Sequence, residues 1–190
     1  MRFKKLHKMI LIINICKEKL HYFEFVKLIE DILESKKLKY FVKHYKDLNN
    51  NDLNKADKII ICGTSLYDNE FIKNLKYFSW IKKFEKPILG ICGGMQIIGL
   101  IFGGKIKKKT EIGFYFENFN KEFLGLIGKQ EVYHLHNYYI DFNRLNSFEI
   151  YCGEKISQAV KHKEKEIYGV LFHPEVRNKE LIEKFANKIS

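Results

Sequence analysis

Proline and glycine are scarce in this chain. Its 190 residues include 2 prolines and 12 glycines, a composition that excludes collagen-like chains and proline- or glycine-rich disordered segments. Apolar residues make up 46% of the chain and aromatic residues 15%, which is enough to build a sizeable buried core. We therefore expect residues 1–190 to form a single packed domain.

Arginine is also scarce, and it occurs only at Arg2, Arg144 and Arg177. The formal net charge of +11 is therefore carried almost entirely by lysines, which are spread along the chain and often stand beside Glu or Asp. Proteins that read nucleic acids commonly use arginine for bidentate contacts. The pattern predicts a solvated lysine surface, and we expect no nucleic-acid partner.

The four cysteines form no C-x-x-C pair, which argues against a zinc ribbon. Long apolar runs are missing as well. The apolar run at residues 9–15 follows a basic start, but it is too short to span a membrane and lacks a small-residue cleavage site. We expect a reduced, cytoplasmic protein with no membrane partner.

Apolar periodicity predicts an α/β fold. Short continuous apolar runs predict buried strands, and apolar residues at three- and four-residue steps predict helices. Between residues 105 and 152 only short β-like pieces occur, joined by polar loops. We expect a parallel sheet with helices on both faces and a small antiparallel excursion. The expected strands are 9–15, 38–44, 58–62, 87–91, 112–116, 131–134, 148–152 and 167–172, the expected helices are 21–36, 69–81, 95–102 and 178–188, and residues 49–51 are expected to form a polar turn.

The stretch from Gly90 to Gln96 has the form G-x-C-x-G between a predicted strand and a predicted helix. This is the thiol version of a nucleophile elbow, in which small neighbours allow a strained strand-to-helix turn. The free N–H groups of the following helix favour a thiolate at Cys92. The N–H of Gly93 can also face the oxyanion formed when that thiolate attacks a carbonyl.

A cysteine nucleophile needs a base within reach, and the base needs an orienting group. His173 and Glu175 stand two residues apart at the end of a predicted strand, so extended backbone puts both side chains on one side. Pro174 between them favours that extended backbone. We therefore predict a Cys92, His173, Glu175 triad. Histidines in charged or helical surroundings are expected to be solvated, namely His7, His21, His44 and His162.

These segments resemble the motifs of the class I, or triad-type, glutamine amidotransferases. Gly-Ile-Cys-Gly-Gly-Met-Gln at 90–96 is similar to the nucleophile motif of the family, and Gly-Val-Leu-Phe-His-Pro-Glu-Val at 169–176 to its triad motif. Further likeness lies in Phe-Gly-Gly-Lys-Ile at 102–106, in Glu-Ile-Gly at 111–113 and in Tyr-His-Leu-His-Asn-Tyr at 133–138. The resemblance spans roughly residues 9 to 190.

The resemblance implies a flavodoxin-like sheet, seven-stranded or similar, and hydrolysis of L-glutamine to glutamate and ammonia through a γ-glutamyl thioester. It implies that Gln96 and the backbone around Asn137 and Tyr138 bind the glutamine, and that the N–H groups of Gly63 and Gly93 form the oxyanion hole. It implies neither a metal nor any other cofactor. One departure is clear, because the family usually has Gly-Gly-Pro-x-Ser where this chain reads Cys-Gly-Thr-Ser-Leu at 62–66.

Three functions remain open at this point. The first is a glutaminase domain that supplies ammonia to a separate synthase subunit, since no ATP-binding segment fits in the chain. The second is a stand-alone hydrolase of γ-glutamyl compounds, suggested by the altered loop at Gly63. The third is a catalytically silent basic module that binds an anionic partner through its lysines.

Overall fold

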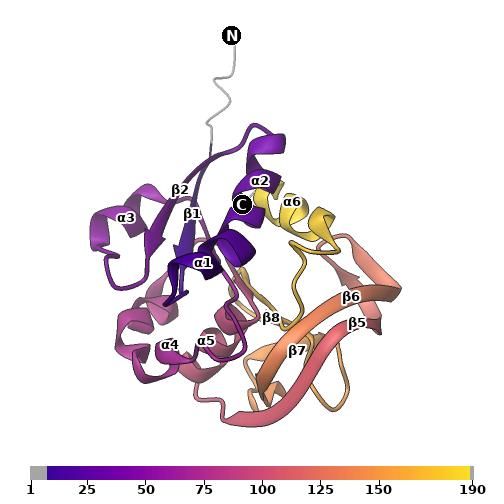
Figure 1. The fold of residues 1–190 in the computed structure, drawn as a ribbon. Helices are drawn as coiled ribbons and strands as arrows, with labels where there is room; N and C mark the ends of the chain where they lie inside the picture. The colour runs from indigo at the N-terminus through magenta and orange to yellow at the C-terminus, as the bar shows by residue number, and fades with distance from the viewer. Residues whose placement is uncertain (1–7, 189–190) are drawn as a thin grey trace.

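The computed structural model describes residues 8–188, and Figure 1 shows their arrangement. Nine strands in this range form one sheet. The strands are β1 (Met9–Asn14), β2 (Lys39–His44), β3 (Lys58–Ile61), β4 (Ile88–Ile91), β5 (Ile106–Phe123), β6 (Leu126–Ile140), β7 (Phe148–Cys152), β8 (Ala159–His162) and β9 (Ile167–Val170). The helices are α1 (Lys19–His21), η1 (Tyr22–Val26), α2 (Lys27–Ser35), α3 (Asn50–Lys55), α4 (Glu70–Lys73), η2 (Leu75–Lys83), α5 (Gly93–Ile101), η3 (Phe142–Arg144) and α6 (Lys179–Asn187).

The sheet order is β2-β1-β3-β4-β9-β8-β7-β5-β6. The first five strands run parallel, and every residue of β3, β4 and β9 is buried. Parallel strands covered on both faces show such unbroken apolar runs. The sequence prediction of a mixed α/β sheet is confirmed, although the antiparallel strands continue the same sheet and bring it to nine strands.

Helices cover both faces of the parallel half, as β3 illustrates. The buried Lys58 points to α6, where its ammonium donates hydrogen bonds to the backbone carbonyls of Phe185, Ala186 and Lys188 at 2.7, 2.9 and 2.6 Å. Three residues further on, Ile61 contacts α5, because a Cβ added at Gly94 of α5 would lie 3.0 Å from its Cβ. Side chains three apart in a strand point to opposite faces, so α5 and α6 lie on opposite sides of the sheet.

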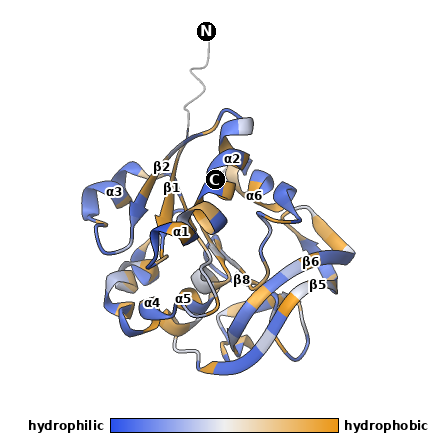
Figure 2. Cartoon of the chain, in the orientation of Figure 1, coloured by the Kyte–Doolittle hydropathy of each residue, from blue (hydrophilic) through white to orange (hydrophobic). Residues whose placement is uncertain are grey.

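The antiparallel half is dominated by the β5–β6 hairpin, which arches away from the parallel strands in Figure 1. Its strands have 18 and 15 residues, far longer than the short pieces predicted at 112–116 and 131–134. Figure 2 shows hydrophilic and hydrophobic residues interleaved along both strands. The hairpin connects through β7 and β8 to β9, so its side chains can approach the end of the parallel sheet.

Three local predictions were wrong. Asn49 does not begin a polar turn, since it is the N-cap of α3 and forms a capping box with Asp52. The helix predicted at 69–81 is split into the short α4 and the 3₁₀ helix η2. His162 is not solvated, because it is 5% exposed and packs against the rings of Phe102 and Phe148. The prediction for His7 lies outside the described residues.

Within residues 8–188, every helix is too short or too polar to traverse a bilayer.

Candidate active site

Cys92 lies in a strained turn between β4 and α5. Its φ of 48° is in the left-handed region, which a residue with a side chain adopts only at a cost. The turn also needs a small residue two positions later, because a Cβ on Gly94 would stand 2.3 Å from the Ile61 carbonyl oxygen. The backbone N–H of Cys92 donates to Val170 of β9 at 2.7 Å, which fixes the turn to the sheet.

The thiol of Cys92 lies at the carboxyl edge of the parallel strands and at the N-terminus of α5. Cys92 is only 4% exposed, and its Sγ lies 3.6 Å from the Leu135 carbonyl oxygen of β6. The sulfur is therefore enclosed between the start of α5 and the backbone of the hairpin.

His173 and Glu175 follow β9 and are both buried, at 1% exposure each. Glu175 Oε1 lies 2.8 Å from His173 Nδ1, and the backbone N–H of His173 donates to Tyr133 of β6 at 2.8 Å. Burial alone would lower the pKa of His173, but the carboxylate of Glu175 and the sulfur of Cys92 raise it well above its ordinary value. The surroundings of His173 therefore favour its protonated ring.

Gly63 packs against both members of the Cys92–His173 pair. A Cβ added at Gly63 would lie 2.6 Å from His173 Cε1 and 3.4 Å from the Cys92 Cβ. Only a residue without a side chain fits there. The backbone of Gly63 therefore lies directly against both His173 and Cys92.

The loop that departs from the family pattern is held by a buried carboxylate that the sequence analysis did not single out. Asp68 Oδ2 accepts hydrogen bonds from Thr64 Oγ1 at 2.9 Å and from the Lys17 backbone N–H at 2.5 Å. The carbonyl of Gly63 accepts from the Cys16 thiol at 3.6 Å. These contacts join the loop after β3 to the loop after β1. Asp68 could not be found from a sequence motif, because its hydrogen-bond partners come from the separate loops after β1 and β3.

The glutamine-binding residues predicted from the resemblance surround one narrow cleft beside Cys92, with a cavity volume of only about 10 Å³. Gln96 Nε2 donates to the Tyr138 carbonyl at 2.8 Å, which joins α5 to the hairpin. Asn137 Nδ2 donates to the Leu66 carbonyl at 3.1 Å, which joins the hairpin to the loop after β3. The cleft is lined by Thr64, Ser65, Leu66, Asn69, Phe71, Cys92, Gly93, Gln96, Leu135, His136, Asn137 and Tyr138.

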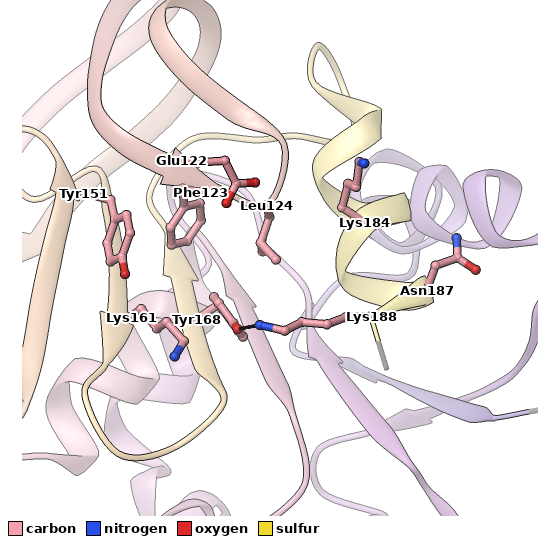
Figure 3. A pocket seen from close by; sticks show the side chains of 9 residues that line it. All are labelled: Glu122, Phe123, Leu124, Tyr151, Lys161, Tyr168, Lys184, Asn187 and Lys188. Carbon is pink, nitrogen blue, oxygen red and sulfur yellow. Dashed lines mark hydrogen bonds between the residues drawn. The ribbon is translucent and has the colours of Figure 1, made fainter. Parts of the chain in front are cut away.

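A larger hollow of about 480 Å³ lies between the hairpin end and α6, and Figure 3 shows its side chains. It shares no residue with the Cys92 cleft. Two of its three lysines are already paired, because Lys161 and Lys188 both pair with Glu166 and Lys188 also bonds Tyr168. The lining residues are Glu122, Phe123, Leu124, Tyr151, Lys161, Tyr168, Lys184, Asn187 and Lys188.

Solved structures resemble this fold over almost its whole length. A GMP synthase subunit from Thermoplasma acidophilum superimposes with a TM-score of 0.82 at 23% identity, covering 95% of this chain and 92% of that one. A glutamine amidotransferase from Thermotoga maritima gives a TM-score of 0.69 at 23% identity, with 94% and 82% covered. At these identities the likeness concerns the fold.

Several relatives found by sequence have higher identities to this chain. A glutamine-hydrolysing GMP synthase of Spiroplasma kunkelii is 36% identical over 126 residues, which cover 62% of this chain and 24% of the relative. A glutamine-hydrolysing GMP synthase subunit of Methanobrevibacter smithii is 37% identical over 108 residues, covering 52% and 55%. This chain thus spans about a quarter of the length of the first relative and about half of the length of the second. The corresponding subunit of Picrophilus torridus is 31% identical over 134 residues, covering 66% and 70%.

The family model for class-I glutamine amidotransferases matches residues 21–189. The match contains both the elbow and the His-Pro-Glu segment, so the resemblance drawn from the sequence is confirmed, and the chain belongs to the class-I glutamine amidotransferase family.

Proposed function

We propose that residues 1–190 act as one glutaminase domain, in which Cys92 is the nucleophile, His173 the general acid and base, and Glu175 the group that orients the imidazole. The observation that carries this proposal is the burial of all three side chains at the carboxyl edge of the parallel strands. There Glu175 Oε1 lies 2.8 Å from His173 Nδ1, and Gly63 packs against both His173 and Cys92. Such a carboxylate holds the ring nitrogen and stabilises the imidazolium.

In the first half of the reaction, the thiolate of Cys92 attacks the side-chain amide carbon of glutamine. The carbonyl π bond opens, and the oxyanion faces the backbone N–H groups of Gly63 and Gly93. One such donor typically contributes about 3 kcal/mol to the stability of the transition state. The imidazolium of His173 then protonates the departing nitrogen, the C–N bond breaks, and ammonia leaves a γ-glutamyl thioester on Cys92.

In the second half, neutral His173 accepts a proton from water, and the resulting hydroxide attacks the thioester carbonyl. The tetrahedral intermediate collapses, the C–S bond breaks, and glutamate leaves while His173 is again protonated beside the thiolate. The glutamine lies in the cleft between α5 and the hairpin, where it contacts Gln96, Asn137 and Tyr138. No step requires a group from outside the cleft other than water.

We further propose that the ammonia passes to a separate synthase subunit. The relatives named as GMP synthase subunits support this, because their name describes one part of a larger enzyme. A GMP-synthase-type partner is thus the first to test. Glutaminase activity is expected to rise when that partner and its substrates are added, and no change with any such partner would contradict this part of the proposal.

The nucleophile is tested with a diazoketone analogue of glutamine and intact-mass measurement. The wild type should gain one adduct and Cys92→Ala none. Cys152→Ala, which removes another buried thiol, is the matched control and should label like the wild type. An adduct on Cys92→Ala, or labelling of the wild type at a different cysteine, would refute the assignment.

A second candidate is a hydrolase of γ-glutamyl compounds with larger leaving amines. It is favoured by an open hollow of about 470 Å³ on the far side of Leu66 and Leu135, lined in part by His173 and Phe25. A leaving amine protonated by His173 could enter it. Turnover of γ-glutamyl conjugates at a higher kcat/KM than glutamine would select this function over the first.

A further inference from the structure

A second cluster of reactive side chains lies on the hairpin, outside the proposed triad. Glu111 comes from β5, and His134 and His136 come from β6. The register pairs Glu111 with His136 directly, and the two histidines, two residues apart, face the same side of the strand. Both imidazoles are buried, at 0% and 2% exposure, and the Glu111 side chain is 16% exposed.

Three atoms of this cluster converge on one point. His134 Nδ1 lies 3.3 Å from His136 Nε2 and 3.6 Å from Glu111 Oε2, and His136 Nε2 lies 3.1 Å from that same oxygen. Ligands about 2.0–2.1 Å from a tetrahedral ion stand roughly 3.3–3.4 Å apart. A triangle with these sides has a circumscribed radius of about 1.9 Å, so a point about 2.1 Å from all three atoms exists just outside their plane.

Without an ion, two ring protons satisfy most of this cluster. A proton on His136 Nε2 donates to Glu111 Oε2 at 3.1 Å, and a proton on His134 Nε2 faces a Glu117 carboxylate oxygen at 3.4 Å. His134 Nδ1 is then a bare lone pair, and it faces Glu111 Oε2 at 3.6 Å. The ion-free cluster therefore keeps two buried acceptors facing each other.

A cation at the centre removes this conflict. Both ring protons would then point outward, and that of His134 Nε2 would face a Glu117 carboxylate oxygen at 3.4 Å. Histidine ligands usually donate their second N–H to such oxygens.

Gln158 lies close enough to the cluster to supply a fourth ligand. Its Nε2 donates to Glu111 Oε2 at 3.2 Å, while its buried Oε1 has no hydrogen-bond partner among the described residues. The two ends of a side-chain amide exchange by a half-turn. After that turn the carbonyl oxygen would face the cluster, and the orphaned position would hold the NH₂ group.

We propose that Glu111, His134 and His136 bind one divalent ion of the zinc type, with Gln158 or a water molecule as fourth ligand. Two imidazoles and a carboxylate suit zinc, and the near-tetrahedral spacing matches its preferred geometry. The site is structural. It fixes His136, which lines the glutamine cleft together with Asn137 and Tyr138. The sequence analysis expected no metal, because the resemblance to the family implies none and the cysteines form no C-x-x-C pair.

The test uses the untagged full chain in a Cys92→Ala background, since a thiolate beside an imidazole is itself a zinc ligand set. The protein is stripped with a chelator, equilibrated with zinc, passed over a desalting column and analysed for metal by mass spectrometry. About one zinc per chain is expected, and cobalt in its place should give the intense visible absorption of a tetrahedral site. Failure to retain zinc at a tenfold excess overturns the proposal.

Variants locate the ion. His134→Gln and Glu111→Gln should each retain less than a tenth of the wild-type zinc, whereas the matched control His44→Gln, at the other edge of the sheet, should retain all of it. Equal retention in the hairpin variants would also overturn the proposal. Circular dichroism checks that these variants fold. The Cys92→Ala protein without a hairpin substitution provides an independent readout. Its Tm should rise by about 5–10 °C when free zinc exceeds Kd a hundredfold.

Discussion

The parallel strands and the β5–β6 hairpin differ most in burial. All residues of β3, β4 and β9 are buried, whereas β5 exposes residues along most of its length, including Ile112 at 52% and Phe114 at 59%. The proposed nucleophile and base are attached to the parallel part, and two of the proposed substrate contacts, Asn137 and Tyr138, lie on the hairpin.

This difference suggests a separation of roles. Bond-breaking groups need positions fixed to a fraction of an ångström, which closely packed strands provide. Substrate contacts on a hairpin with an exposed face can change without disturbing the core. Substitutions in the parallel half should therefore affect rate or folding, and substitutions in the hairpin should affect affinity.

Glu175→Gln is expected to have the largest effect, lowering kcat/KM about 10³–10⁴-fold, as the loss of an orienting carboxylate does in triad enzymes. Glu175 helps to raise the pKa of His173, so the imidazolium persists to high pH. Without that carboxylate the pKa falls, and the alkaline limb of the pH–rate profile should move to lower pH. An unchanged profile with a lowered rate would mean that Glu175 acts only as a packing group.

Ile60→Ala should destabilise the protein by about 2–5 kcal/mol, because Ile60 is fully buried in β3 and the lost side chain leaves a cavity. Urea unfolding followed by circular dichroism measures the change. A loss below about 1 kcal/mol would contradict the view that the parallel half carries the stability of the fold.

Asn137→Ala should raise KM for glutamine about tenfold with a smaller change in kcat. Asn137 accepts from Thr110 at 2.8 Å and donates to Leu66 at 3.1 Å, and a lost hydrogen bond typically costs about 0.5–1.5 kcal/mol. Steady-state kinetics separates the two parameters. Asn120→Ala, an exposed position on the same hairpin, serves as control and should leave both unchanged.

Ile112→Ala should have the smallest effect, a change of less than about 0.5 kcal/mol in the free energy of unfolding, since its side chain is half-exposed. Together, Ile112→Ala and Ile60→Ala compare the loss of an isoleucine side chain in the two regions by the same urea titration. Similar losses at both positions would abolish the distinction between core and hairpin.

The parallel half was largely predictable from sequence because its strands are short apolar runs, such as Lys58–Ile61, bounded by polar residues. The elbow and the His-Pro-Glu segment were predictable because each combines a chemical group with a backbone constraint. Their meeting across about eighty residues followed from the parallel order, in which the carboxyl ends of neighbouring strands share one edge.

The hairpin was not predictable to the same extent. Its two strands are irregular, with a register shift between Lys108 and Glu111, so strict alternation is lost. The helix at Asn50 was missed because asparagine and aspartate serve both turns and N-caps. The burial of His162 depends on two rings, Phe102 and Phe148, that are distant in sequence.

The ammonium of Lys58 ties the first residue of β3 to the last turn of the C-terminal helix. Burial lowers the pKa of this lysine to about 8, with the charges of Lys8 and Lys188 contributing. The carbonyls at the end of α6 are the acceptors that make a cation tolerable there. A truncation or fusion that unwinds this turn would leave the Lys58 ammonium buried without acceptors. Because Lys58 begins the strand that leads to Gly63, we expect such a change at the end of α6 to shift the position of Gly63.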